Sequence, residues 1–343
     1  MKNRLALRWR GQPGTRNALV ICPRFFQYPD MIGAELERAG YTVALADDRP
    51  GRGTLYKLLL RLFPAAVGAV SASDFADLAT ALGDTRFDLV LVIKGEALTP
   101  TAVASLRARF PAAHFAYYLW DSVRNVGNAP DIAPLFDTIS TFDREEARSF
   151  SWRYRPLFSA ATAGLPADAP KIYDWSFVGT IHSDRAKVIR RLRKAMPTLS
   201  SFVFGYFPSP LIATAHRLKD PAINSDPDGT ISLKPMAGEQ LRAVLDQSRA
   251  ILDIEHPRQT GLTMRTIETL LAGRKLITTN RQVAQSALFH PSRVHVIDRE
   301  APMVPGSFFE TPFEPLPPET AANYSIRTWV EDLTSLTHID RQF

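Results

Sequence analysis

Short apolar runs alternate with amphipathic segments along most of the chain. Asn17–Cys22, Tyr41–Ala46 and Asp88–Ile93 have the length of strands, and segments with helical spacing such as Pro29–Arg38 separate them. After its first residue, Asp88–Ile93 is continuously apolar, which is typical of a strand buried on both faces of a parallel sheet. The alternation predicts βαβ units and an α/β fold with doubly wound sheets.

The alternation stops and restarts near the middle of the chain. Residues 159–171 are rich in Ala, Pro and Gly, so we expect an interdomain linker there. The predicted domains cover 1–160 and 161–317, and a last helix lies within 318–343. Further strands are predicted at 114–119, 138–142, 154–158, 175–178, 201–204, 250–254, 276–279 and 293–297, and helices at 99–109, 183–195, 238–247, 262–272 and 318–334.

The segment Pro257–Asn280 combines a glycine turn, an amphipathic helix, a glycine stop and a short strand. Gly261, Arg265 and Glu268 are spaced at i, i+4 and i+7, so they share one face of the predicted helix. Gly273 is well placed to end this helix. The N–H groups at the helix start and Arg265 would bind phosphates, and Glu268 would accept hydrogen bonds from ribose hydroxyls.

The same residues permit a second interpretation. Arg265 and Glu268 are also three residues apart, which is the spacing of an ion pair on a helix surface. Spacing alone therefore leaves both a nucleotide-diphosphate site and an ordinary surface pair open.

A second glycine turn follows the first predicted strand of the second domain. Within Phe177–Arg185, Gly179 permits close approach of the backbone to a ligand, and Ser183 is placed to cap the next helix. The turn lacks the three-glycine dinucleotide fingerprint, so it is a weak signal alone. Because parallel strands end at one edge of a sheet, we expect Gly179 and Gly261 on the same rim.

Charged side chains follow apolar strands in the first domain as well. Asp121 comes just after a strand, where it is placed either to act as a general base on a hydroxyl or to cap the next turn. Lys94 follows the preceding strand, where it is placed to hold an anion or to pair with Glu96. Arg24 follows the first strand and is a third candidate on this rim.

Composition changes this picture little. The 343 residues are enough for two domains with full cores, and 45% hydrophobic and 22% charged residues are usual for a globular protein. The single cysteine, Cys22, ends an apolar run and is expected in the core, which suits a reducing cytoplasm.

We expect neither a signal peptide nor a membrane-spanning helix. The net charge of +6 fits an anionic small molecule, an anionic membrane surface or no specific partner.

Several classes of site are absent from the sequence pattern. No His, Asp or Cys residues have metal-ligand spacing, and no serine-nucleophile elbow or P-loop is present. The basic residues form no long stripe, so nucleic acid is a poor fit. The apolar segment Leu55–Phe63 carries Lys57 and Arg61, and it suits either an anionic membrane or an ordinary packed helix.

Five motifs occur in an order that resembles a known family. They resemble bacterial polysaccharide-biosynthesis glycosyltransferases of GT-B architecture, including relatives of spore-maturation-type glycosyltransferases. The motifs are Tyr-Tyr-Leu-Trp-Asp-Ser (117–122), Leu-Phe-Asp-Thr-Ile-Ser-Thr-Phe-Asp (135–143), Ser-Phe-Val-Gly-Thr-Ile-His-Ser-Asp-Arg (176–185), Gln-Thr-Gly-Leu-Thr-Met-Arg-Thr-Ile-Glu (259–268) and Lys-Leu-Ile-Thr-Thr-Asn (275–280).

The resemblance implies two Rossmann-like domains facing a cleft, with the last helix crossing back onto the first domain through Tyr324 and Trp329. It implies an acceptor-binding first domain and a second domain that binds a nucleotide sugar, with no tightly bound cofactor. Acceptor contacts are then expected at Arg24, Lys94 and Glu96. Donor contacts are expected at Gly179, Thr180, Arg185, Tyr206, Thr260, Gly261, Leu262, Thr263, Arg265 and Glu268.

One departure from the family bears on mechanism. Many retaining GT-B enzymes carry two glutamates with seven residues between them, whereas here Thr260 precedes Glu268 at that spacing. A retaining mechanism of the kind that group uses is therefore in doubt, and an inverting displacement with Asp121 as base is the hypothesis. GT-B enzymes usually need no essential metal, because cationic side chains and helix N-termini stabilise the leaving diphosphate.

The resemblance favours a cytoplasmic enzyme that adds sugar to a growing surface polysaccharide or lipopolysaccharide. A lipid-linked acceptor would place it peripherally at the inner face of the membrane. Two alternatives remain open at this point: a nucleotide-sugar epimerase on the same scaffold, and a non-catalytic nucleotide- or glycan-binding module.

Overall fold

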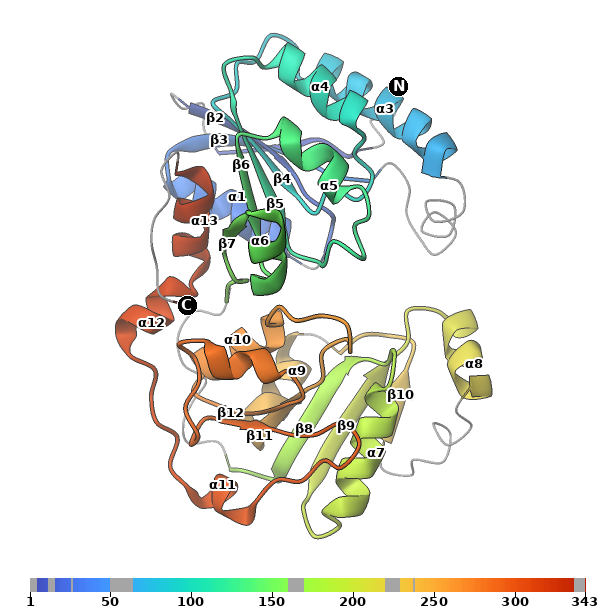
Figure 1. The fold of residues 1–343 in the computed structure, drawn as a ribbon, viewed down its shortest axis with the longest axis vertical. Helices are drawn as coiled ribbons and strands as arrows, with labels where there is room; N and C mark the ends of the chain where they lie inside the picture. Colours follow the sequence, from blue (N-terminus) through green and yellow to red (C-terminus); the bar gives the residue numbers. More distant parts are fainter. Residues whose placement is uncertain are drawn as a thin grey trace. The chain divides into compact units, whose positions relative to one another are not determined.

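The computed structural model describes residues 5–11, 16–25, 27–49, 64–159, 170–219, 229–236, 238–335 and 343. The chain forms two compact units (Figure 1). Unit 1 comprises residues 1–160 and 324–341, and unit 2 comprises residues 161–323 and 342–343. Each unit has one sheet covered by helices.

The sheet of unit 1 has seven strands in the order β1-β3-β2-β4-β5-β6-β7. All neighbours are parallel except β1 and β3, which pair antiparallel. Every residue of β4 is buried, which confirms the prediction for the apolar run there. The strands are β1 (Arg8–Arg10), β2 (Arg16–Ile21), β3 (Tyr41–Ala46), β4 (Leu89–Ile93), β5 (His114–Leu119), β6 (Thr138–Thr141) and β7 (Arg153–Tyr154).

Helices and one 3-10 turn surround this sheet. Helix α4 begins with a side-chain cap, because the Thr99 hydroxyl accepts a hydrogen bond from the N–H of Ala102. Gly40, with φ of +88°, follows α1. The elements are α1 (Tyr28–Arg38), α3 (Pro64–Ala81), α4 (Pro100–Arg109), α5 (Ala129–Ile132), η1 (Ala133–Leu135), α6 (Arg144–Phe150) and α13 (Ile326–Thr334).

The last helix, α13, packs on α1 and β5 of unit 1. Trp329 is fully buried, with its ring centroid 4.8 Å from that of Tyr118 and 4.7 Å from that of Phe158. Beside it, Arg155 Nε lies 2.8 Å from Asp332 Oδ2, and the Arg155 side chain is only 3% exposed. The C-terminal part of the chain thus returns to the first sheet, as expected.

The sheet of unit 2 has six parallel strands in the order β10-β9-β8-β11-β12-β13. The order reverses direction at β8, so β8 and β11 flank the switch point where ligands of such sheets bind. The strands are β8 (Tyr173–Thr180), β9 (Ser201–Tyr206), β10 (Gly229–Ser232), β11 (Ser248–Asp253), β12 (Lys275–Thr278) and β13 (Val294–Val296).

One apolar cluster covers a face of this second sheet. Val188, Leu192 and Ala213 pack there against Trp175 and Phe177. Helices α9 and α10 contact the sheet through β8, β11 and β12. The elements are α7 (Arg185–Ala195), α8 (Pro210–Lys219), α9 (Gly238–Asp246), α10 (Met264–Leu271), η3 (Arg281–Gln285), α11 (Gly306–Glu310) and α12 (Pro318–Asn323).

The structure corrects several predicted boundaries. The helix predicted from residue 262 begins at Met264, because Thr263 is its N-cap, so Gly261 and Leu262 precede the helix. The predicted helix 318–334 is two helices, since Ser325 is extended and its hydroxyl caps α13. The strand predicted at 154–158 pairs only at 153–154, and the proline at 156 has no N–H to continue the ladder.

Ser183 does not cap α7, contrary to prediction. Asp184 occupies the N-cap position and makes no side-chain cap bond, while Ser183 has a left-handed φ of +48°. The apolar segment 55–63 and most of the predicted linker lie outside the described residues.

Candidate functional site

A buried carboxylate at the end of β11 organises the start of α10. Asp253 is 4% exposed, and its Oδ2 accepts hydrogen bonds from the hydroxyls of Thr263 (2.5 Å) and Thr266 (2.7 Å). Thr263 Oγ1 in turn accepts from the N–H of Thr266 at 3.1 Å. The first-turn amides of Met264 and Arg265 have no acceptor within the helix. The helix start is thereby fixed with N–H groups pointing beyond the sheet edge.

Arg265 and Glu268 project from the first two turns of this helix. The Arg265 guanidinium lies 3.8 Å from the Glu268 carboxylate, and their side chains are 24% and 28% exposed. At 3.8 Å the contact is an ion pair longer than a hydrogen bond. Both groups of the expected donor site therefore remain reachable by a ligand while they balance each other's charge.

Side-chain amides bind the backbone of the loop before α10, while the Leu262 side chain packs inside. Asn280 Nδ2 donates to the carbonyls of Thr260 and Gly261, each at 3.2 Å, and Gln259 Nε2 donates to the Gly261 carbonyl at 3.1 Å. Leu262 is buried. Asn280 follows β12, so two neighbouring strand ends hold this loop.

The turn after β8 brings Gly179, Thr180 and Arg185 together. Arg185 donates to the Thr180 carbonyl at 2.8 Å and, across to the loop after β11, to the Ile254 carbonyl at 2.5 Å. A Cβ at Gly179 would lie 3.2 Å from the Phe177 ring and 3.7 Å from Arg185. Burial lowers the pKa of Arg185. Arg185 thus joins two loops of the candidate donor edge.

Tyr206 lies at the same edge, as the last residue of β9. It is in register with Thr180, and its carbonyl accepts from the N–H of Ile181 at 2.9 Å. The predicted strand ends at residue 204, whereas β9 continues to Tyr206.

An ion-pair network at this edge was missed by sequence reasoning. Arg299 donates to Asp184 Oδ1 (2.8 Å) and to Glu255 Oε1 (2.5 Å), and Glu255 Oε2 accepts from the Thr279 hydroxyl (2.5 Å). Burial raises the pKa of Glu255. These residues come from loops far apart in the chain, so spacing gave no signal. Their effect is to fasten the strand ends together.

Two histidines also meet at this edge. The ring centroids of His182 and His256 are 5.8 Å apart at an interplanar angle of 28°. Burial, followed by the Arg185 charge, lowers the pKa of His182 to about 3. The same causes, with Arg258 added, lower the pKa of His256. Both rings are therefore neutral at neutral pH.

The corresponding edge of unit 1 carries a chain of ion pairs. Lys94 Nζ lies 3.1 Å from Asp121 Oδ2 and 3.3 Å from Glu96 Oε2. Arg49 lies 3.7 Å from the same Glu96 oxygen. Burial acts against the Lys94 charge, but the Asp121 and Glu96 carboxylates outweigh it and raise the pKa of Lys94. Of the two roles that the sequence leaves open for Lys94, the ion pair with Glu96 is present.

Asp121 caps the turn after β5, which is one of the two roles that the sequence left open. Its Oδ1 accepts from the N–H of Ser122 (2.9 Å) and from Asn125 Nδ2 (2.8 Å), which caps the turn, while Oδ2 faces Lys94. Its side chain is 28% exposed. Arg24 pairs with Asp47, and the distance between Arg24 Nε and Asp47 Oδ2 is 3.9 Å.

The backbone that presents Lys94 is strained. Lys94 has a left-handed φ of +67°, and the Tyr117 hydroxyl donates to its carbonyl at 2.8 Å. Gly95 is also left-handed at +64°, and a Cβ there would lie 3.1 Å from Val92. Such a conformation costs about 1–3 kcal/mol for a non-glycine residue and is concentrated at functional sites.

Carboxyl groups near this edge resist ionisation. Burial raises the pKa of Asp48 and of Glu146 to about 7 each. Asp48 accepts from the N–H of Glu96 at 3.2 Å, and Glu146 accepts from the N–H of Val123 at 2.7 Å. Near neutral pH these two carboxyl groups are therefore only partly ionised.

Two further findings concern the described residues alone. They contain no group of three or more His, Cys, Asp or Glu side chains arranged to hold a metal ion. None of the helices they form is both long enough and apolar enough to cross a bilayer.

Comparison with known proteins gives the fold. No family model matches the sequence, and no curated protein matches it. Apo OtsA is similar to the chain with a TM-score of 0.62 and 12% identity, over 95% of this chain and 100% of OtsA. Anabaena HepE in complex with UDP-glucose has a TM-score of 0.58 and 10% identity, over 92% of this chain and 98% of HepE. AviGT4, a glycosyltransferase involved in avilamycin A biosynthesis, has a TM-score of 0.55 and 15% identity, over 93% of this chain and 95% of AviGT4. The chain has the GT-B fold with two Rossmann-like domains, as the sequence indicated.

Proposed function

We propose that this protein is a glycosyltransferase that moves a sugar from a nucleotide-sugar donor to an acceptor glycan. The observation that carries the proposal is the start of α10, where Asp253 fixes the Thr263 cap and Arg265 and Glu268 remain partly exposed. Amides and a guanidinium recognise a diphosphate, and a carboxylate recognises ribose hydroxyls. HepE, one of the proteins with a similar fold, was solved with UDP-glucose.

The donor contacts follow from the rim of unit 2. The backbone at Gly179, Thr180, Thr260, Gly261 and Leu262 lines this rim together with Arg185, Tyr206 and Thr263, and Arg265 and Glu268 complete it. Because Arg185 is engaged by two carbonyls, we assign it to holding the loops and Arg265 to the diphosphate. Cationic and N–H groups here would stabilise the leaving diphosphate without a metal ion.

The acceptor would bind at the edge of unit 1, through Arg24, Lys94 and Glu96. Asp121 would take the proton of the acceptor hydroxyl as that oxygen attacks the anomeric carbon. The bond from the anomeric carbon to the donor phosphate breaks, and the diphosphate leaves with its electron pair. This single displacement inverts the anomeric centre. We place the reaction in the assembly of a surface polysaccharide or lipopolysaccharide.

The test is release of nucleoside diphosphate from a panel of UDP-, GDP- and ADP-sugars, with and without acceptor glycans. We expect acceptor-dependent release that persists in EDTA and that Arg265→Ala abolishes. Arg281→Ala, at an exposed ion pair of the same unit, is the matched control and should leave release unchanged.

Other outcomes point elsewhere. Conversion of a nucleotide sugar without release would establish an epimerase, and binding without turnover would establish a binding module. Unchanged release by Arg265→Ala would refute the proposed donor site.

A further inference from the structure

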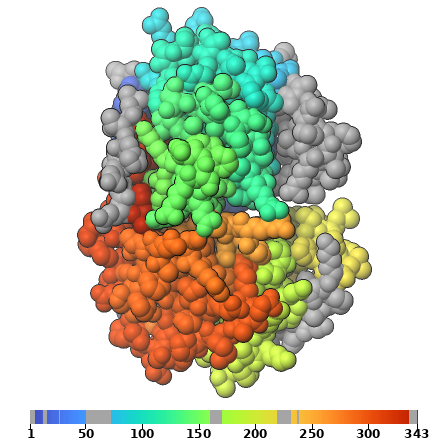
Figure 2. All heavy atoms as spheres, in the orientation of Figure 1, coloured from blue at the N-terminus to red at the C-terminus, as the bar shows by residue number. Residues whose placement is uncertain are grey.

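Helices α7 and α8 lie on one face of the sheet of unit 2. They connect β8 to β9 and β9 to β10, two steps in the same direction across the sheet, and right-handed crossovers place both helices on the same side. The packing agrees, because Val188 and Leu192 of α7 and Ala213 of α8 belong to one apolar cluster. Both helices are on the surface of the unit (Figures 1 and 2).

This face concentrates positive charge. Besides Arg185, which is held at the donor edge, the sequences of α7 and α8 contain seven arginine and lysine residues and no aspartate or glutamate. The net charge of the whole chain is +6. Lys187 and Lys194 are exposed and seven residues apart, so they share one side of α7. Arg191 is partly neutralised by its ion pair with Glu300.

The neighbouring helix exposes leucine. Leu211 is 80% exposed and Leu218 is 79% exposed, the two highest values among the large hydrophobic side chains that the structure describes. They are also seven residues apart and share one side of α8, with exposed Ala215 between them. Ala213 is buried on the other side, so α8 carries apolar side chains both toward the core and toward solvent.

We propose that this face of unit 2 docks on an anionic lipid bilayer. Leu211 and Leu218 would enter the headgroup region while Lys187, Lys194 and Arg217 contact lipid phosphates, a combination typical of interfacial helices. Bilayer docking rather than nucleic-acid binding is favoured because neither helix contains Phe, Trp or Tyr for base stacking. The proposal rests on the surface of unit 2 and not on the proposed activity.

The test is co-sedimentation of the full chain with vesicles. Two compositions are used, phosphatidylcholine alone and phosphatidylcholine with about 30% phosphatidylglycerol, which supplies the negative surface potential. We expect binding only to the anionic vesicles. Leu211→Ser with Leu218→Ser, and separately Lys187→Glu with Lys194→Glu, should each weaken that binding by about tenfold or more.

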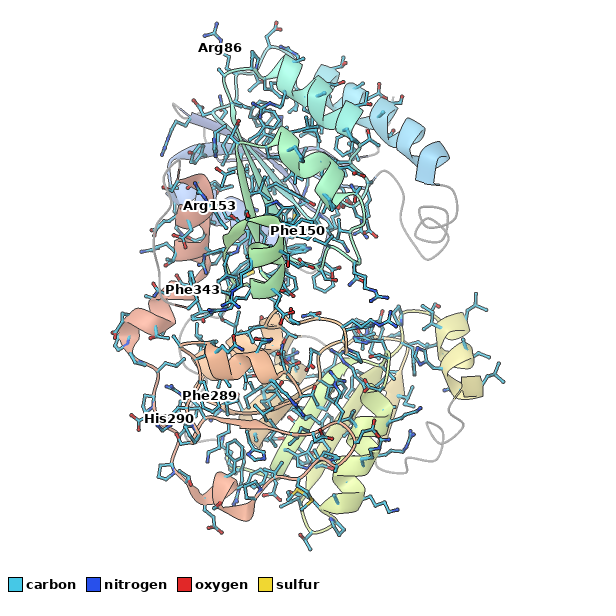
Figure 3. All side chains as sticks on the ribbon, viewed as in Figure 1. Arg86, Phe150, Arg153, Phe289, His290 and Phe343 are labelled. Carbon is cyan, nitrogen blue, oxygen red and sulfur yellow. The ribbon has the colours of Figure 1, made fainter. Side chains whose placement is uncertain are left out.

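Matched controls make the same chemical changes elsewhere. Ile172→Ser removes another exposed apolar side chain, and Arg86→Glu with Arg148→Glu reverses two exposed charges on unit 1, where Arg86 is labelled in Figure 3. Both controls should bind vesicles as the unchanged protein does. Circular dichroism checks that every variant is folded.

Three results would overturn the proposal. They are absence of binding to anionic vesicles, equal loss in the control variants, and retention of binding when both leucines are replaced. If instead the leucine variant converts a dimer to a monomer and vesicles never bind, the face is an interface between copies of this chain.

Discussion

The carboxyl edges of the two sheets carry different titratable groups. Unit 1 gathers carboxylates around Lys94, and burial there raises the pKa of Asp48 and Glu146 to about 7. Unit 2 gathers arginines, and burial together with Arg185 lowers the pKa of His182 to about 3. Burial is the main cause at both edges, so it favours protonated carboxyl groups at one edge and neutral histidines at the other.

This difference suits two different ligands. An edge with arginines, open helix amides and neutral histidines offers hydrogen-bond donors to a diphosphate, although Glu268 lies beside Arg265 there. An edge with a carboxylate held by a lysine can bind a hydroxyl and take its proton. In both Rossmann-like units, the residues that follow the parallel strands determine which ligands each edge can bind.

The largest expected effect separates chemistry from binding. Asp121→Asn keeps the turn bonds to Ser122 and Asn125 but removes the base, so transfer should fall by about 10²–10⁴-fold. Donor affinity should not change, because the residue lies in the other unit. Steady-state kinetics and equilibrium donor binding, measured on the same variant, check both statements. Full transfer by the variant would remove Asp121 from the mechanism.

The next effect concerns the construction of the unit 2 edge. Asp253→Ala leaves the hydroxyls of Thr263 and Thr266 without their buried acceptor, and unit 2 should lose about 2–4 kcal/mol of unfolding free energy. Denaturant unfolding measures this loss. Arg281→Ala, which removes the exposed partner of Asp298 in the same unit, should leave the unfolding free energy nearly unchanged. Equal losses would show that the Asp253 network does not organise α10.

The acidic edge should respond to rising pH. Because the folded pKa of Glu146 is about 7, above the usual 4.5, the folded state loses stability as pH rises from 4.5 through 7. Glu146→Gln can still accept the hydrogen bond from the N–H of Val123, but it cannot ionise. At pH 8 the unfolding free energy of the variant should therefore exceed that of the unchanged protein by about 2 kcal/mol. At pH 4 the gain should vanish. Unfolding at both pH values tests this, and a gain independent of pH would contradict it.

The basic edge should respond to falling pH. The unfolded state takes up a proton at His182 below pH 6.5 and the folded state does not until about pH 3, so stability falls over that interval. His182→Gln cannot take up this proton. Between pH 7 and 5 the unfolding free energy of the variant should therefore fall by about 1 kcal/mol less than that of the unchanged protein. His290→Gln is the comparison variant, and an identical response from it would argue against a special role for His182.

Local patterns predicted much of this fold. The apolar run at β4 and the stop at Gly273, with φ of +69°, depend only on neighbours in the chain. The grouping of Arg265 and Glu268 on one helix face was likewise available from spacing. These features could be predicted because period and turn chemistry are properties of a short segment.

The rest depends on partners far along the chain. The helix start at Thr263 is fixed by Asp253, and the Arg299 network joins a residue 115 positions away in Asp184. The pair of Arg155 and Asp332 joins the C-terminal helix to the first sheet. Long-range pairing of this kind leaves no periodic signal in the sequence, so only the fold reveals it.

The central claim is that unit 2 alone holds the nucleotide. Calorimetric titration of UDP, GDP and ADP measures it directly on Arg265→Ala, Glu268→Ala and Lys94→Met. The affinity of Arg265→Ala and of Glu268→Ala for the nucleotide that the unchanged protein binds should be about tenfold or more weaker, because each variant loses a charged hydrogen bond. The affinity of Lys94→Met should equal that of the unchanged protein. Normal binding by both unit 2 variants, or loss of binding in Lys94→Met, would contradict the account.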